Sequence, residues 1–140
     1  MTATFFGHKD TPKSIEPVLR STIIELIEKQ NVTEFYVGNQ GNFDTMVHRQ
    51  LRELSLIYPI NYSVVLAYLP NKNDNTENTI YPEGLESVPR RFAISHRNKW
   101  MIKQADPVVT YVKNSFGGAY QFKASAVNQG KKVIELSSIQ

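Results

Sequence analysis

The feature that most constrains this chain is the alternation of short β-prone runs with longer segments of helical periodicity. Strands are expected at residues 2–6, 34–37, 62–68, 107–112 and 133–136, and helices at 14–30, 43–56, 93–104 and 118–128. Such alternation is typical of an α/β fold, in which helices cover both faces of a parallel sheet through right-handed crossovers. We therefore expect a Rossmann-like three-layer α/β/α domain with five parallel strands, in the order 3-2-1-4-5.

One long excursion interrupts this pattern at residues 69–92. The chain of 140 residues is long enough for one core, so we treat residues 1–140 as a single domain. Residues 71–78 are all polar or charged, whereas residues 80–92 include more apolar and aromatic side chains. An excursion this long in so small a domain is usually either disordered or a functional lid. We predict a lid that is mobile at 71–78 and ordered near 82–89.

Glycine turns follow three of the expected strands. These turns are Gly7-His8, Gly38-Asn39-Gln40-Gly41-Asn42-Phe43-Asp44 and Ser115-Phe116-Gly117-Gly118-Ala119. In parallel α/β sheets, ligands bind beyond the carboxyl ends of the strands, where the strand order switches direction. A glycine turn that opens a helix lets an anion approach backbone N–H groups. We therefore predict an anion site above strands one, two and four; the alternative at 38–44 is an ordinary turn with Asn42 as the helix N-cap.

A basic side chain interrupts the apolar face of the helix expected at 93–104. Ile94 and Met101 lie seven residues apart and share a face, and Arg97 and Asn98 lie between them on that face. A buried arginine is unfavourable unless it is paired, and its planar fork suits phosphate or carboxylate groups. We predict that Arg97 and Asn98 contact the ligand. The alternative is an internal ion pair between Arg97 and a glutamate of the excursion.

Four titratable residues have more than one interpretation. His8 is a general acid or base, a phosphate donor, or a turn histidine that bonds to the backbone. Asp44 is either a first-turn acid that interacts with the helix dipole or an acceptor for a ribose hydroxyl. Glu83 and Glu86 are the glutamates that could pair with Arg97. The histidines have no metal-ligand spacing, so we expect no metal, and we expect no resident cofactor.

The composition excludes several classes of protein. The chain has no cysteine, which excludes a disulfide scaffold, a thiol nucleophile and cysteine-ligated zinc. A formal net charge of +3 without a dense Lys/Arg run suits a small anionic ligand and does not require nucleic acid. We find neither a signal-peptide pattern nor an apolar run of membrane-spanning length, so we expect a cytoplasmic protein without a membrane partner. Homo-oligomerisation stays open.

Taken in order, these motifs resemble one superfamily. Gly7-His8, the GNQGNFD turn at 38–44, Arg97-Asn98-Lys99 and the SFGGA turn at 115–119 resemble the SLOG superfamily over nearly the whole chain. Its members are Rossmann-like proteins related to DprA and to the LOG phosphoribohydrolases, and the nearest likeness is to small YpsA-like bacterial or phage members. The resemblance implies binding of a nucleotide or nucleotide derivative. Some members cleave the N-glycosidic bond of nucleoside monophosphates, and others sense ligands or bind single-stranded DNA.

The resemblance also implies roles for particular positions. GNQGNFD lies where LOG enzymes have a GGG phosphate turn, and Arg97 and Lys99 lie where they have the Arg-Lys of their central helix. Gly117-Gly118-Ala119 lies where they have a PGGxGT turn followed by a catalytic glutamate. Residues 119–122 contain no carboxylate, so enzymatic activity stays open.

The resulting expectation is a protein that binds or senses a nucleotide derivative. One alternative is a nucleoside-phosphate N-glycosidase in which another group supplies the missing acid, the candidates being His8, Glu83 and Glu86. The other alternative is DprA-like binding of single-stranded DNA. The weak basic balance and the lack of a stripe of aromatic and basic residues disfavour this second alternative.

Overall fold

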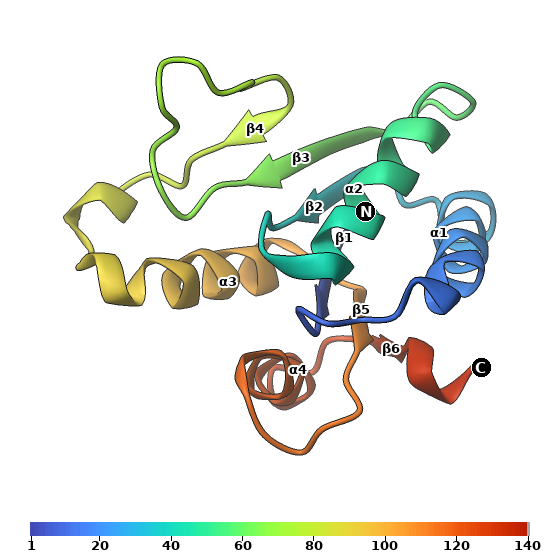
Figure 1. Cartoon of the computed structure of the whole chain (residues 1–140). Helices are drawn as coiled ribbons and strands as arrows, with labels where there is room; N and C mark the ends of the chain where they lie inside the picture. The colour runs from blue at the N-terminus through green and yellow to red at the C-terminus, as the bar shows by residue number, and fades with distance from the viewer. Residues whose placement is uncertain (140) are drawn as a thin grey trace.

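Six parallel strands form one sheet in the computed structural model, which describes residues 1–139 (Figure 1). The strands are β1 (Thr2–Gly7), β2 (Glu34–Val37), β3 (Asn61–Val65), β4 (Thr79–Ile80), β5 (Val108–Tyr111) and β6 (Val133–Glu135). Four helices follow strands or the excursion: α1 (Glu16–Gln30), α2 (Gly41–Leu54), α3 (Ala93–Gln104) and α4 (Gly118–Asn128). The predicted Rossmann-like α/β architecture with a parallel sheet is therefore confirmed.

The number and order of the strands differ from the prediction. The sheet has the order β4-β3-β2-β1-β5-β6, not five strands in the order 3-2-1-4-5. The difference comes from β4, which the excursion contributes and which pairs with β3 through Val64 with Thr79 and Val65 with Ile80. A strand of two residues is too short to show the alternation by which strands are recognised in sequence. In Figure 1 the yellow-green excursion forms this edge of the sheet and then leads into α3.

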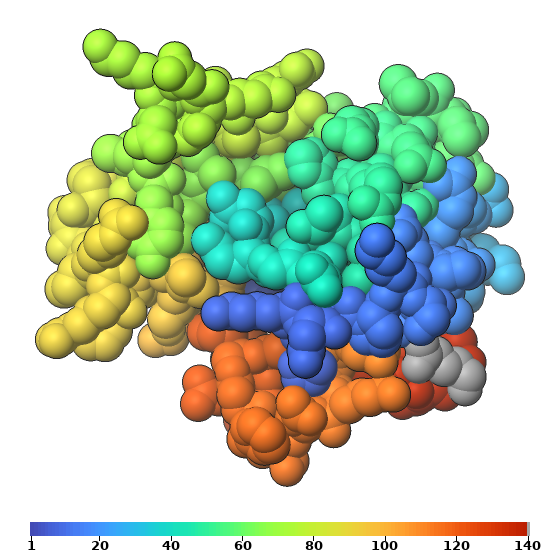
Figure 2. Space-filling view, viewed as in Figure 1, coloured from blue at the N-terminus to red at the C-terminus, as the bar shows by residue number. Residues whose placement is uncertain are grey.

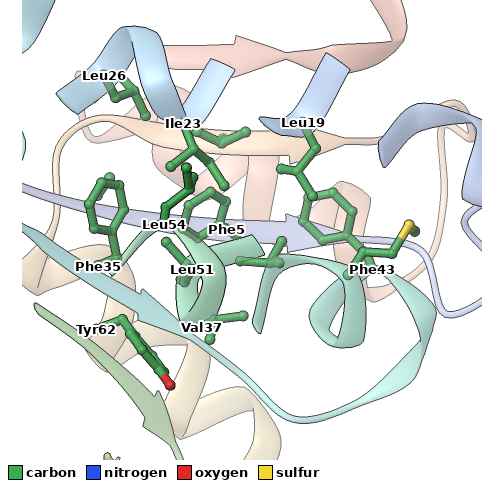
Figure 3. Packing of buried hydrophobic residues seen from close by; sticks show 14 of the residues in the cluster. Phe5, Leu19, Ile23, Leu26, Phe35, Val37, Phe43, Leu51, Leu54 and Tyr62 are labelled. Carbon is green, nitrogen blue, oxygen red and sulfur yellow. The ribbon is translucent and has the colours of Figure 1, made fainter. Parts of the chain in front are cut away.

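Two apolar cores hold the three layers together. On one face α1 and α2 pack on the sheet, and Figure 3 shows Leu19, Ile23, Phe43 and Leu51 from these helices gathered around Phe5 of β1. On the other face a second cluster joins α3 and α4 to the sheet; its buried residues are Phe6, Val65, Met101, Ile102, Val108 and Ala126. Because successive side chains of a strand point to opposite faces, neighbours such as Phe5 and Phe6 belong to different cores.

Gly7, at the end of β1, allows α2 to approach the sheet. A Cβ atom at Gly7 would lie 2.2 Å from Cγ of Phe43, a separation that real Cβ atoms do not show. The fully buried ring of Phe43 therefore occupies the space that a side chain at position 7 would need. This close packing gives Gly7 a structural reason to be glycine and brings the start of α2 beside the end of β1.

The excursion divides into an exposed part and a packed part. Every residue from 71 to 78 is exposed, whereas Pro82 and Leu85 are buried ahead of the 3-10 turn Arg90–Phe92 that leads into α3. This difference in exposure follows the predicted division of the excursion, while its mobility and its action as a lid stay predictions. No helix within residues 1–139 combines the length and the apolar character that crossing a membrane requires.

Candidate functional site

A cavity of about 280 Å³ opens at the carboxyl end of β1 and reaches the starts of α2 and α4 and one face of α3. β1 lies between β2 and β5, so the strand order switches direction beside this cavity. The polar part of its lining consists of His8, Lys9, Gln40, Asp44, Arg97 and Asn98. The apolar part comprises Phe5, Phe6, Ile94, Met101 and Phe122, and Gly7, Gly118 and Ala119 complete it. The lining of the cavity therefore combines apolar side chains with charged and amide groups.

Arg97 lies on the buried face of α3 and is only 2% exposed. Its Nε donates to Oδ1 of Asn98 at 2.7 Å, and its Nη2 donates to Oε1 of Gln40 at 3.1 Å. Its Nη1 donates to the carbonyl of Val65 at 2.9 Å and to Oδ1 of Asn39 at 3.3 Å. All four acceptors are neutral oxygen atoms, so the guanidinium is hydrogen-bonded without being neutralised.

The predicted alternative partners of Arg97 are not beside it. Glu83 and Glu86 are exposed, and the ion pairs among residues 1–139 do not include Arg97. An internal pair of Arg97 with either glutamate is therefore wrong. Burial lowers the pKa of Arg97, and the negative charge of Asp44 acts in the opposite direction. Arg97 is thus a buried cation with a carboxylate nearby but none within ion-pair distance.

Asp44 is the carboxylate near Arg97. Its Oδ2 accepts a hydrogen bond from the backbone N–H of Gln40 at 2.9 Å, as expected of a first-turn acid. Burial raises the pKa of Asp44 to about 6, although the Gln40 hydrogen bond and the Arg97 charge both act to lower it. A Cβ atom at Gly38 would lie 2.8 Å from Oδ2 of Asp44 and 3.0 Å from Nη1 of Arg97. Gly38 therefore leaves the space in which these two side chains face each other.

The turn at 38–42 is largely closed by internal hydrogen bonds. The N–H of Gln40 bonds to Asp44, and the N–H of Asn42 donates to the carbonyl of Lys9 at 2.8 Å. Gly41 has φ +85°, and a Cβ atom there would lie 2.7 Å from Cα of Lys9. The alternative with Asn42 as N-cap is wrong, because α2 begins at Gly41 with Gln40 as its N-cap. This packing gives the glycine turn a structural function, and the N–H groups of Gln40 and Asn42 are already bonded within the protein.

The turn that opens α4 differs from the turn at 38–42. Gly117 is the N-cap, with φ +93°, and no side chain of residues 1–139 caps the helix. A Cβ atom at Gly117 or Gly118 would meet nothing within 4 Å, so the fold does not use these glycines for close packing. The first N–H groups of a helix have no acceptor within the helix and attract anions. The start of α4 is therefore the more open of the two glycine turns, and Gly118 lines the cavity.

His8 lines the cavity and is held by backbone bonds. Its Nε2 accepts a hydrogen bond from the N–H of Lys113 at 3.0 Å, and its carbonyl accepts bonds from the N–H and Oγ1 of Thr11. An imidazole nitrogen that accepts a hydrogen bond carries no proton, so Nδ1 is the protonated nitrogen in this arrangement. These hydrogen bonds to backbone groups agree with the interpretation of His8 as a turn histidine. They also fix its ring at the cavity wall.

The structure does not bring all predicted site residues to this cavity. It brings together Gly7, His8, Gln40, Asp44, Arg97, Asn98 and Gly118. The residues that lie outside its lining are Gly38, Asn39, Gly41, Asn42, Glu83, Glu86, Ser115, Phe116 and Gly117. Phe116 is 71% exposed and does not reach the cavity.

The residues that the sequence analysis missed are Lys9 and the apolar wall. Phe122 lies four residues after Gly118, a spacing that puts both on one face of α4 and that could have identified it. Across the part of the chain that the structure describes, no three His, Cys, Asp or Glu residues gather as a metal-binding group would.

The fold and this site define the class of the protein: a Rossmann-like α/β domain with a small cavity at the switch point of a parallel sheet. Comparisons of the sequence with family models and with curated proteins find no match. The resemblance to the SLOG superfamily therefore stays a prediction that rests on the motifs themselves.

Proposed function

We propose that this protein binds or senses a nucleotide or nucleotide derivative, with the anionic group of the ligand in the cavity beside Arg97. The observation that carries the proposal is the buried guanidinium of Arg97, whose hydrogen-bond acceptors are all neutral. Buried charges are normally paired, because removing a charge from water is unfavourable without a counter-charge. Asp44 lies near Arg97 but not within ion-pair distance, so an anion in the cavity would supply a counter-charge in direct contact with the guanidinium.

The start of α4 supports the same placement of the anion. Gly118 borders the cavity with open space where a side chain would be, and the first-turn N–H groups of α4 lack a side-chain cap. A phosphate there would interact with these N–H groups and with the helix dipole. The cavity of about 280 Å³ is at the lower end of the range for small-molecule sites, roughly 300–1,000 Å³. That volume favours a ligand no larger than a mononucleotide.

Substitution of Gly118 by alanine tests this proposal. The new methyl group would enter the space of the anion, whereas helix propensity predicts unchanged or slightly higher stability, by up to about 1 kcal/mol. We expect nucleoside 5′-monophosphates to bind the wild type in calorimetry and Gly118→Ala to weaken them at least about tenfold, or about 1.4 kcal/mol. Nucleosides without phosphate should bind weakly to both.

Gln121→Ala is the matched control, because Gln121 is an exposed residue of the same helix outside the cavity lining. It should leave the affinity unchanged. Equal affinities of the wild type and Gly118→Ala, with equal melting temperatures, would argue against an anion at the start of α4. Analysis of small molecules released from the purified protein identifies the ligand if one is carried through purification.

Cleavage of an N-glycosidic bond is the second candidate function. Glu83 and Glu86 lie outside the cavity lining, and Asp44 is the sole carboxylate among the described residues that line it. Its pKa of about 6 is near the operating pH at which a carboxyl group can act as a general acid. Release of free base from nucleoside monophosphates, lost in Asp44→Asn, would support this function. If a nucleotide binds but no free base is released, binding is the only function that remains supported.

A further inference from the structure

A larger cavity of about 820 Å³ lies near the β4 edge of the sheet and shares no lining residue with the cavity around Arg97. Its floor is β3 and the residues just after it, and its walls are the second half of α2 and the excursion. In Figure 2 the outline of the molecule dips between the yellow-green atoms of the excursion and the green atoms at the end of α2. Its volume is in the range of small-molecule sites, roughly 300–1,000 Å³.

Two tyrosine rings form the aromatic part of this cavity. The ring of Tyr62 lies 5.5 Å from the ring of His48, and its hydroxyl accepts a hydrogen bond from Nδ2 of Asn78 at 3.3 Å. The ring of Tyr68 is covered on one face by the guanidinium of Arg90, 4.3 Å from the ring centroid. Tyr62 belongs to the buried core, so the half-buried ring of Tyr68 is the flat surface on which a planar ligand can stack.

Two arginines line the same cavity from different walls. Arg52 comes from α2, and Arg90 comes from the 3-10 turn that precedes α3. Neither forms an ion pair with a carboxylate of residues 1–139. In contrast, Arg20 and Arg49 of the adjoining helices are paired, with Glu53 at 3.3 Å and with Glu16 at 2.7 Å. The unpaired guanidinium forks of this cavity have the geometry that suits a phosphate or carboxylate group.

The acidic residues of the cavity lie together on the exposed loop. The carboxylate of Asp74 accepts a hydrogen bond at 2.8 Å from the N–H of Asn71, three residues earlier. This local bond fixes the Asp74 carboxylate within the loop. Glu77 lies on the same exposed stretch. The positive groups come from α2 and from the turn before α3, so the charge of the lining is divided between its walls.

We propose that this larger cavity binds a flat aromatic anion, whose ring stacks on Tyr68 and whose anionic group contacts Arg52 and Arg90. Both a nucleotide and an aromatic carboxylate have this chemistry. The site is separate from the cavity around Arg97. Asn39 lines the larger cavity and Gln40 lines the smaller one. The side chains of both accept hydrogen bonds from the guanidinium of Arg97.

An NMR titration of the full chain tests the proposal. The probes are AMP and 4-hydroxybenzoate, and adenosine serves as an aromatic probe without charge. We expect one or both anions to shift the backbone amides of His48, Arg52 and Asn78 in a saturable way, and adenosine to shift them much less. Binding of AMP alone would identify a nucleotide site, and binding of 4-hydroxybenzoate alone would identify an aromatic carboxylate site.

Four variants establish where the probe binds. Arg52→Ala and Arg90→Ala should each weaken binding about tenfold, as expected for a lost charged hydrogen bond. Arg91→Ala is the matched control, because Arg91 is the exposed neighbour of Arg90 and does not line the cavity. Gly118→Ala should leave these shifts unchanged, since it alters only the smaller cavity.

Two outcomes would overturn the proposal. One is the absence of saturable shifts at His48, Arg52 and Asn78 with both anions at millimolar concentration. The other is an equal effect of Arg90→Ala and Arg91→Ala on binding. Arg90 would then contribute only through general surface charge and not through contact with the ligand.

Discussion

At the scale of single residues, glycine occurs in this edge of the sheet for two different reasons. Gly7, Gly38 and Gly41 are each required by a side chain or backbone atom within about 3 Å of the missing Cβ atom. Gly117 and Gly118 have no such neighbour within 4 Å. Gly117 has a φ of +93°, which favours glycine, whereas Gly118 has neither a positive φ nor a close neighbour. Gly118, at an uncapped helix start, is therefore the stronger indication of a ligand. The two groups of glycines look alike in the sequence, and only the atoms around them in the fold distinguish one group from the other.

Arg97 is the residue whose substitution should affect both affinity and stability. Arg97→Ala removes a charged hydrogen-bond donor from the ligand and also leaves the carbonyl of Val65 without its guanidinium partner. We expect the affinity for nucleoside monophosphates to fall about tenfold to a hundredfold, or roughly 1.5–3 kcal/mol. Arg97→Lys should restore little, because an ammonium group lacks the planar fork.

Calorimetry with the ligand and thermal unfolding without it separate the two effects of Arg97. The affinity is measured under conditions in which each variant is folded. A large fall in melting temperature with unchanged affinity would assign Arg97 to the fold alone. Unchanged stability with reduced affinity would assign it to the ligand alone.

At the scale of elements, the excursion is expected to be the first segment that a protease cleaves. Residues 71–78 are exposed and polar, so they bury little surface against an ordering entropy of roughly 1–2 kcal/mol per residue. Limited trypsin digestion should therefore cut first at Lys72 and later at Arg90 and Arg91, which follow the buried Leu85. AMP should slow the first cut if the excursion closes over a ligand. First cleavage at Arg90 or Arg91, with no effect of AMP, would contradict both the division of the excursion and its action as a lid.

The elements with clear periodicity could be predicted from the sequence, and those fixed by distant contacts could not. α3 and α4 have the predicted bounds, because apolar spacing and glycine define them locally. The strand expected at 62–68 ends at Val65, and Leu66 and Tyr68 after it line the larger cavity. The position of Arg97 on the same face of α3 as Ile94 and Met101 also followed from helical spacing. The closure of the turn at 38–42 did not, because it depends on Lys9, which is far away in the sequence.

At the scale of the whole molecule, the charge of Asp44 is expected to set part of the pH dependence of stability. Its carboxyl has a pKa of about 6 in the folded protein and an ordinary value of 3.8. The folded state therefore holds this proton more tightly than the unfolded state does. The contribution of Asp44 becomes less favourable as the pH rises from about 4 through 6, and the loss is complete above about pH 7.

Asp44→Asn removes this dependence, because an amide keeps the hydrogen-bond acceptor for Gln40 without the charge. Relative to the wild type, the variant should be equally stable near pH 4 and more stable at pH 8, by on the order of 1–3 kcal/mol. Urea unfolding of both proteins at several pH values measures the difference, in which the histidine contributions cancel. Asp10→Asn, at an exposed carboxylate of the β1–α1 loop, controls for the loss of one negative charge. If the stability difference between the wild type and Asp44→Asn is the same at every pH, the carboxyl of Asp44 is not desolvated by the fold.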